Sequence, residues 1–202
     1  MVHDCEVGLK GNMNNFAYDL QILKYSNIGC RKVKSFRALE CTFSLPASDR
    51  ILLCCDGASQ GNPGCAGYGF IARDSEGKFI FAESVRLGIS TKFIAEVLGI
   101  IGALEWAVLN SKDKVNINSD STTAITAFIK TKLPWFVWTR WLFICRKLRS
   151  IHFNHVYRET NFSADFFANK CVYLMKGQEM KFSNRPSNMH RMEMPDKIYY
   201  TF

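Results

Sequence analysis

Four acidic residues stand out because each one interrupts an apolar stretch of the sequence. Asp56 follows the run ILLCC, and Asp120 follows the alternating segment KVNINS. Glu96 and Asp165 have mainly apolar neighbours in the segments FIAEVLG and SADFFAN. Any single one has an ordinary explanation as a turn or capping residue, because carboxylates are favourable near helix N-termini. Four such acids, two at expected strand ends and two at expected helix starts, point to a shared site.

The chemistry open to four neighbouring carboxylates is the binding of divalent cations. If these side chains meet in space, they repel one another strongly unless cations neutralise them. Sites built only from oxygen ligands select hard cations such as Mg²⁺ or Mn²⁺. The sequence therefore predicts a metal site at Asp56, Glu96, Asp120 and Asp165.

The elements that would position these acids are predicted from the apolar patterns. Residues 51–56 form an almost wholly apolar run, typical of a strand covered on both faces. Residues 65–74 and 78–87 predict two more strands, joined by the turn DSEG as a hairpin. The order of all the predicted strands and helices along the chain indicates a mixed sheet with helices on both faces. The later elements expected are helices over 91–110, 122–132, 135–150 and 162–176 and strands over 114–120 and 151–159.

The ends of the chain have a weaker pattern than the middle. Residues 1–48 hold one possible short helix, NNFAYDLQILKYSNI, and the basic stretch GCRKVKSFR, so we interpret them as an appendage or linker. Residues 49–176 carry the predicted sheet and helices, and residues 177–202 are interpreted as a C-terminal tail.

Composition narrows the classes of function. The net charge of +8 favours polyanionic partners, above all nucleic acid. The eight cysteines include no C-x-x-C pair, and several lie in apolar runs, as free buried thiols do. Neither a signal peptide nor an apolar run of roughly 20 residues is apparent, so no membrane association is expected. These features predict an intracellular protein of the nucleus or cytoplasm.

Four segments resemble the ribonuclease H family, and most closely the plant ribonuclease H-like domains related to non-LTR retrotransposon reverse transcriptases. The resemblance covers residues 50 to about 175 and implies a five-stranded mixed sheet and cleavage of the RNA strand of RNA–DNA hybrids. By position, Asp56, Glu96, Asp120 and Asp165 match the catalytic acids of the family, which bind two Mg²⁺ or Mn²⁺ ions. The segments are DGASQGNPGCAGYGFIARDSEGK, AEVLGIIGALEWA, INSDS and HVYRETNFSADFFAN.

The resemblance also implies which residues bind the substrate. We expect the protein to be a monomer. The stretch GASQGNPG would let the backbone approach the RNA strand closely, so that 2′-hydroxyls are read; a plain Gly/Pro loop is the alternative. Arg158 is a candidate phosphate contact. The expected substrate-binding residues are Gly57, Ala58, Ser59, Gly61, Asn62 and Arg158.

Two features depart from many relatives or leave alternatives open. His155 precedes Asp165 but falls on a predicted strand, so we expect a partly buried histidine without a catalytic role. The segment WFVWTRWLFICRKLRS interleaves aromatic and basic residues, as nucleic-acid-binding surfaces do. Because Trp135 and Trp138 have helical spacing with Leu142, we predict that the tryptophans belong to the core and that some of the basic residues contact phosphate weakly.

Three classes of function remain compatible with the sequence. The first is an active metal-dependent endonuclease acting on hybrids. The second is a nucleic-acid-binding domain that retains the fold without catalysis, and the third is a protein-interaction module on the same fold. The presence of all four acids favours the endonuclease.

Overall fold

The computed structural model describes residues 16–27 and 38–201, which belong to two compact units, Met1–Leu39 with Phe202 and Glu40–Thr201. In the first unit, helix α2 (Ala17–Tyr25) lies within the helix expected from the sequence. The basic stretch over 29–37 is outside the described residues. Both the central sheet and its helices belong to the second unit.

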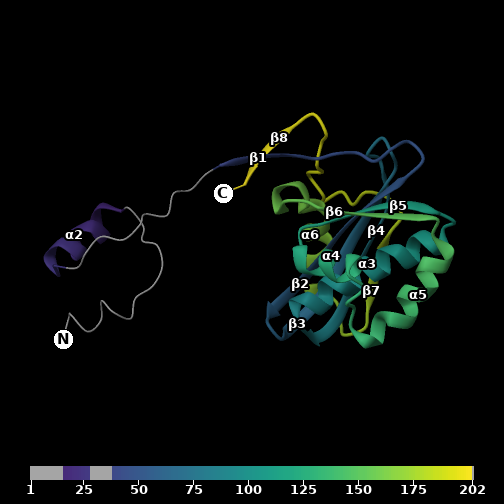
Figure 1. Ribbon diagram of the computed structural model, residues 1–202, viewed down its shortest axis with the longest axis horizontal. Helices are drawn as coiled ribbons and strands as arrows, with labels where there is room; N and C mark the ends of the chain where they lie inside the picture. The colour runs from purple at the N-terminus through teal and green to yellow at the C-terminus, as the bar shows by residue number, and fades with distance from the viewer. Residues whose placement is uncertain (1–15, 28–37, 202) are drawn as a thin grey trace. The chain divides into compact units, whose positions relative to one another are not determined.

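A six-stranded mixed sheet forms the centre of the second unit, in the order β6-β5-β2-β3-β4-β7 (Figure 1). Strand β2 pairs antiparallel with β3 and parallel with β5, which in turn pairs parallel with β6. The five strands predicted from residues 50 to 159 are all present, and the α/β fold is confirmed. Their bounds are β2 Ile51–Gly61, β3 Gly64–Arg73, β4 Phe79–Ser90, β5 Lys114–Ser119 and β6 Ser150–His155.

The segment expected to be a tail contributes to the sheet. Strand β7 (Glu179–Phe182) pairs antiparallel with β4 and becomes the sixth strand. Farther on, β8 (Ile198–Thr201) pairs with β1 (Leu39–Thr42) in a separate two-stranded sheet. The number of strands therefore differs from the expected five, because short exposed strands such as EMKF carry too few apolar residues to be distinguished from a tail.

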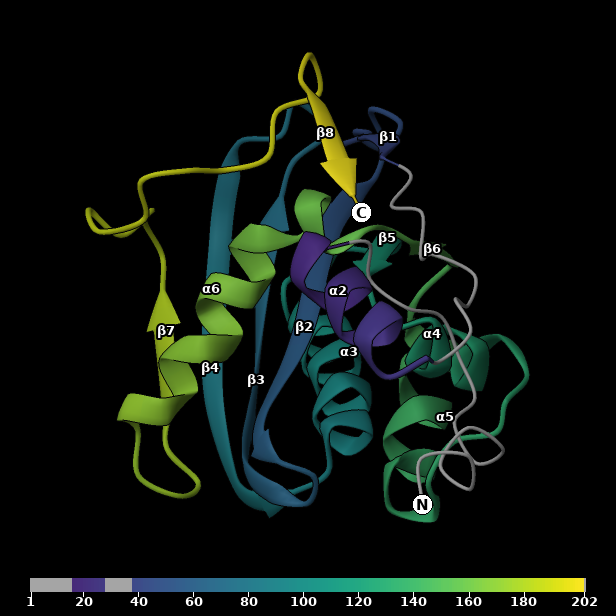
Figure 2. The same ribbon diagram turned by 90° about the vertical axis from the view of Figure 1, so that its left-hand side faces the viewer.

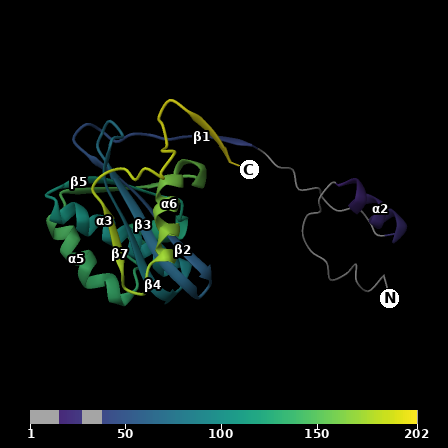
Figure 3. The ribbon, with the colours of Figure 1, turned by 180° about the vertical axis from the view of Figure 1, so that it is seen from behind.

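Helices cover the two faces of the sheet unequally. Alternate residues of β2 separate the two cores: Leu53 and Cys55 pack with α3, α4 and α5, whereas Leu52 and Cys54 pack with α6. Figures 1 and 3 show these two layers from opposite sides. The helices are α3 Lys92–Leu109, α4 Thr122–Ile129, α5 Trp138–Lys147 and α6 Phe162–Lys170, with 3-10 turns η1 Trp135–Val137, η2 Arg158–Thr160 and η3 Cys171–Tyr173.

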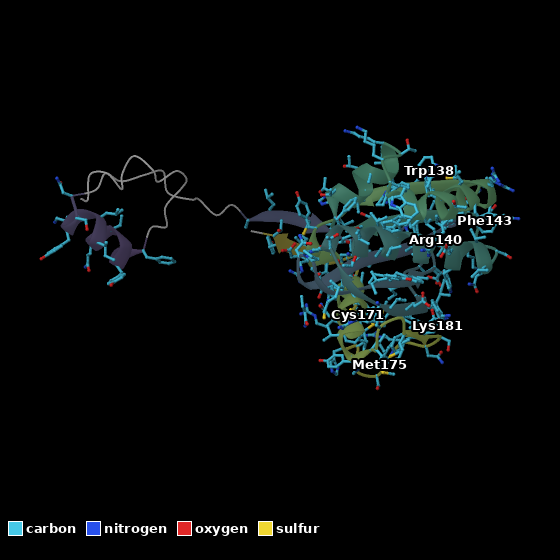
Figure 4. The ribbon with its side chains drawn as sticks, turned by 90° about the horizontal axis from the view of Figure 1, so that it is seen from below. Trp138, Arg140, Phe143, Cys171, Met175 and Lys181 are labelled. Carbon is cyan, nitrogen blue, oxygen red and sulfur yellow. The ribbon has the colours of Figure 1, made fainter. Side chains whose placement is uncertain are left out.

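Helix α5 and the turn before it present aromatic side chains to solvent. Seen from below, Trp138, Arg140 and Phe143 lie on the side of the unit opposite to Cys171, Met175 and Lys181 (Figure 4). Trp141 is buried, but Trp135 is 87% exposed and Trp138 is 39% exposed. The prediction that the tryptophans belong to the core is therefore wrong for Trp135 and Trp138, because the 3-10 turn at Trp135–Val137 breaks the helical spacing on which it was based.

The glycine-rich stretch after Asp56 is not a plain loop. Strand β2 continues through Gly61, and its last residues remain paired with β3, from Gly57 opposite Tyr68 to Gly61 opposite Gly64. Only Asn62 and Pro63 connect the two strands. Residues expected to approach a substrate thus lie on a paired strand, which holds their backbone in a fixed position.

Within residues 16–27 and 38–201, none of the helices combines the length and the apolar character that crossing a bilayer requires.

The N-terminal boundary of the folded unit gives the first prediction. Deleting residues 1–38 is expected to leave cooperative unfolding intact, because residues 40–201 form one compact unit. Deleting residues 1–45 should cost about 3 kcal/mol more, since it removes Phe43, which is 2% exposed in the core beneath α6. Thermal unfolding followed by circular dichroism compares the two truncations, and equal melting temperatures would contradict this boundary.

Candidate metal centre

Three of the four predicted acids meet at one end of the sheet. Asp56 lies on β2, Glu96 in the second turn of α3, and Asp120 directly after β5. One carboxylate oxygen from each lies within 4.8 Å of the other two. Asp56 is 5% exposed and Glu96 is 2% exposed, so this cluster lies largely beneath the surface. The structure therefore brings together acids that are up to 64 positions apart in the chain.

The close approach of α3 to β2 depends on Gly57. A Cβ atom at this position would lie 2.4 Å from the backbone nitrogen of Glu96, which is too close for any other residue without movement of the backbone. The hydroxyl of Thr91 caps α3 by accepting a hydrogen bond from the Ile94 N–H at 3.3 Å. The cap begins the helix one turn before Glu96, and Gly57 lets that turn lie directly against Asp56.

Asp120 is left available because its neighbour performs the capping. The hydroxyl of Ser121 accepts the Ala124 N–H at 3.3 Å and so caps the start of α4. Asp120 has one carboxylate oxygen, Oδ1, that is buried and lacks a hydrogen-bond partner among the described residues. Glu96 has a second such atom, Oε2.

Asp165, the fourth predicted acid, lines the same pocket but is not in the three-acid cluster. It lies in the first turn of α6, where Arg158 donates to Oδ1 at 2.9 Å and the Asn169 amide donates to Oδ2 at 2.9 Å. The Asp165 side chain is 30% exposed, so solvent screens its ion pair with Arg158. The pocket has a volume of about 150 Å³ and is lined by Asp56, Gly57, Ala58, Ser59, Lys92, Asp120, Arg158, Asp165 and Asn169.

Burial and mutual repulsion raise the pKa of two of these acids. The pKa of Asp56 rises to about 7, mainly because burial disfavours its charged form and also because Asp120 and Asp165 are close. The pKa of Glu96 rises to about 9, again through burial first and then through Asp56 and Asp120. Lys92, whose Nζ lies 3.8 Å from Glu96 Oε1, opposes both shifts but is itself exposed. With all its carboxylates ionised, the cluster would thus carry more negative charge than the described side chains around it compensate.

The donor set suits a hard divalent cation. All the convergent atoms are carboxylate oxygens, which Mg²⁺ and Mn²⁺ prefer over softer ligands. Two of these oxygens are buried without a partner, although buried polar atoms are normally hydrogen-bonded. A cation would satisfy both atoms and neutralise the repulsion that raises the two pKa values. The residues present therefore fit a metal ion.

Helix α6, which carries Asp165, is anchored by contacts that the sequence did not suggest. Glu193 accepts the Ser163 N–H at 2.7 Å through Oε1 and so caps the start of the helix. Arg73 forms a buried ion pair with the Glu193 carboxylate and donates to its backbone oxygen at 3.1 Å. Asn161, just before the helix, donates to the Cys55 backbone oxygen at 3.0 Å. The start of α6 is thereby tied both to β2 and to the C-terminal segment.

Other predicted residues are placed as follows. Asn62 is exposed and accepts the Lys92 N–H at 3.1 Å, which ties the β2–β3 turn to the start of α3. Ser59 donates to the Gly61 oxygen at 2.5 Å. His155 ends β6 and is exposed, so the expected partial burial is wrong. It packs edge-on to Tyr157 with ring centroids 5.9 Å apart and is not among the residues lining the acidic pocket.

The raised pKa values predict how stability depends on pH in the absence of metal. In the unfolded chain Asp and Glu titrate near pH 4, so between about pH 4 and pH 9 the folded protein binds more protons than the unfolded chain. In EDTA the melting temperature should therefore fall as the pH rises from 5 to 9, through the titration of Asp56 and then of Glu96. Added Mg²⁺ should restore most of the loss at pH 8 to 9, because it binds only the folded site.

Melting curves in EDTA at four pH values test this dependence. Asp56→Asn should reduce the fall, and Glu76→Gln, a change at an exposed glutamate outside the cluster, should leave it unchanged. A melting temperature that stays level or rises between pH 5 and pH 9 would contradict the shifted pKa values.

The chain is similar to known proteins over a range that includes all four predicted acids. Residues 54–171 match a protein family described as Reverse transcriptase-like. An Arabidopsis thaliana protein, provisionally named a ribonuclease H protein, is 31% identical over 135 residues, which cover 60% of this chain and 20% of that protein. The chain thus spans about a fifth of the length of this relative.

Two solved ribonucleases have a similar fold. RNase H1 of the archaeon Halobacterium salinarum NRC-1 aligns with a TM-score of 0.55 at 26% identity, over 61% of this chain and 98% of the archaeal one. LC11-RNase H1, isolated from compost and solved in complex with an RNA/DNA hybrid, aligns with a TM-score of 0.53 at 26% identity, over 59% of this chain and 94% of its own.

Proposed function

The chain belongs to the reverse transcriptase-like family and carries a ribonuclease H family domain, and from this premise we propose that it hydrolyses the RNA strand of RNA–DNA hybrids. The observation that carries the proposal is the cluster of Asp56, Glu96 and Asp120, whose carboxylate oxygens lie within 4.8 Å of one another. A merely structural cluster would pair its buried oxygens with donors, whereas Glu96 Oε2 and Asp120 Oδ1 have none among the described residues.

We assign Asp56, Glu96, Asp120 and Asp165 as the residues that would hold two divalent cations, Mg²⁺ or Mn²⁺. When bound, such ions lower the pKa of a water molecule to make it a nucleophile and stabilise the leaving oxygen of an in-line displacement at phosphorus. Asp56 lies on β2, a central strand of the sheet, and contributes its oxygen together with Glu96 of α3 and Asp120 at the end of β5. Asp165 approaches from α6 and would complete the set.

The same pocket offers contacts for the RNA strand. Gly57, Ala58 and Ser59 line it from the paired end of β2, so their backbone is held in a fixed position beside the acids. The 2′-hydroxyl is the group that distinguishes RNA from DNA, and backbone groups on a rigid strand can recognise it. Gly61 and Asn62 extend this surface through the β2–β3 turn. Arg158, 71% exposed in its side chain, can reach a phosphate by turning away from Asp165.

A panel of labelled substrates tests the proposed function. The full chain is incubated with an RNA–DNA hybrid, the corresponding DNA duplex and the RNA duplex, each with Mg²⁺, Mn²⁺ or EDTA. We expect cleavage of the RNA strand of the hybrid with either metal, none in EDTA, and no cleavage of the DNA duplex. Binding of the hybrid without cleavage under all conditions would instead favour a nucleic-acid-binding domain that has lost catalysis.

A further inference from the structure

A second hollow, on the outer side of α6, adjoins the acidic pocket. We call it the α6 groove; its volume is about 540 Å³. Figure 2 shows α6 on the outside of its layer. The groove is more aromatic than the acidic pocket, and amide and basic groups lie beside its rings. Its lining residues are Phe162, Asp165, Phe166, Asn169, Lys170, Tyr173 and Asn188.

The spacing of these residues places them in a stripe along the helix. Phe162, Phe166 and Lys170 follow one another at intervals of four, and Tyr173 follows in the next turn, so all four share one side of α6 and η3. From Phe162 to Tyr173 the stripe extends roughly 16 Å at the helical rise per residue. Asn188, from the C-terminal segment, also lines the groove. The result is a track long enough for a few nucleotides of an extended strand.

The side chains in the stripe are those that hold single-stranded nucleic acid. Tyr173 is 87% exposed, although a large aromatic ring is usually more buried on a monomeric surface. Lys170 Nζ lies 4.8 Å from the centroid of the Phe166 ring, and the Arg191 guanidinium lies 5.6 Å from that of Phe162. Rings stack against bases, and cations beside them attract the phosphates between those bases. Asp165 is the only acid among the lining residues.

The groove is continuous with the site already described. Asp165 and Asn169 line both hollows, and the Asn169 amide donates to Asp165 Oδ2 at 2.9 Å. A strand leaving the acidic pocket over these two residues would pass directly onto the rings of the stripe. An apolar protein ligand would gain nothing from that continuity, so nucleic acid fits the groove better.

We propose that the α6 groove binds unpaired nucleotides of a strand that continues beyond the hybrid, so that the preferred substrate is a hybrid with a single-stranded flank. This inference rests on the proposed function for the position of the hybrid. It assigns to Tyr173, Phe166 and Lys170 a role in binding rather than in cleavage.

Fluorescence anisotropy with the full-length Asp56→Asn chain in Ca²⁺ tests the proposal. The probes are a blunt hybrid and hybrids of the same length with six unpaired RNA nucleotides at the 5′ or the 3′ end. We expect one of the two flanked hybrids to bind about tenfold more tightly than the blunt one, a typical gain from stacking one base on an aromatic ring. Tyr173→Ala should abolish this gain and change the affinity for the blunt hybrid by less than about twofold. Lys170→Gln should reduce the gain.

A matched control is available because Trp135 is as exposed as Tyr173, at 87%, but precedes α5 in the other layer. Trp135→Ala should leave the tenfold gain unchanged. The proposal is overturned if neither flank improves binding, or if the gain survives Tyr173→Ala. In parallel, cleavage of the blunt hybrid is measured with two chains that retain Asp56: the unsubstituted chain and its Tyr173→Ala variant. If neither chain cleaves the hybrid, the proposed function is refuted. A gain in affinity for the flanked hybrid that depends on Tyr173 would still support nucleotide binding in the α6 groove.

Discussion

Asn in place of Asp56 is expected to reduce cleavage of an RNA–DNA hybrid to the level measured in EDTA. Asp56 contributes an oxygen to the cluster with Glu96 and Asp120, and a neutral amide in its place cannot compensate the charge of a divalent cation. The two side chains have nearly the same shape, so the fold should persist. Initial rates of cleavage with saturating Mg²⁺ measure the effect.

Two controls make this result specific. Asp49→Asn changes an exposed acid outside the pocket and should leave the rate unchanged. In EDTA at pH 8, Asp56→Asn should melt at or above the temperature of the unmodified chain, because it removes one of the repelling charges. Cleavage at more than a tenth of the normal rate in Asp56→Asn would show that Asp56 is not part of the catalytic site.

The largest effect on stability is expected from Glu193→Ala. This change leaves the Arg73 guanidinium, which is 1% exposed, without its buried partner and removes the cap from the Ser163 N–H. Breaking a buried ion pair by removing one partner typically costs about 3–5 kcal/mol. In a chain of this size we expect the melting temperature to fall by roughly 10 °C. Chemical denaturation measures the change in the free energy of unfolding.

The appropriate comparison is with a neighbouring acid and with a double substitution. Asp196→Ala, three residues farther along the same segment and exposed, should change stability by less than about 0.5 kcal/mol. Arg73→Met combined with Glu193→Leu should recover much of the loss, because apolar residues can replace both charges together. If Glu193→Ala costs no more than Asp196→Ala, the C-terminal segment does not anchor α6.

The carboxylate cluster was accessible from the sequence because each acid follows or begins a strongly patterned element. The apolar run before Asp56 and the alternation before Asp120 indicate strand ends, and parallel strands β2 and β5 bring such ends to one edge of a sheet. The capping of α3 by Thr91 and of α4 by Ser121 involves local hydrogen bonds between residues three positions apart. Patterns of this kind are contained within one segment, which makes them predictable.

The contacts that anchor α6 were not accessible in the same way. Arg73 and Glu193 are 120 positions apart, and neither has a local pattern that indicates burial. Strand β7 is short and polar, so only its pairing with β4 identifies it. The exposure of Trp135 likewise depends on a 3-10 turn where the spacing predicted a continuous helix. These features arise from tertiary contacts, which override local propensity and periodicity.

The chemistry of the cleavage products tests the central claim most directly. The hybrid is incubated with the full chain and Mg²⁺ in water enriched in ¹⁸O, and the RNA fragments are analysed by mass spectrometry. Hydrolysis by an activated water that displaces the 3′-oxygen predicts fragments with a 3′-hydroxyl and a 5′-phosphate, with one ¹⁸O in that phosphate. Fragments ending in a 2′,3′-cyclic phosphate, or the absence of fragments that depend on Mg²⁺, would contradict a metal-dependent hydrolysis at Asp56, Glu96, Asp120 and Asp165.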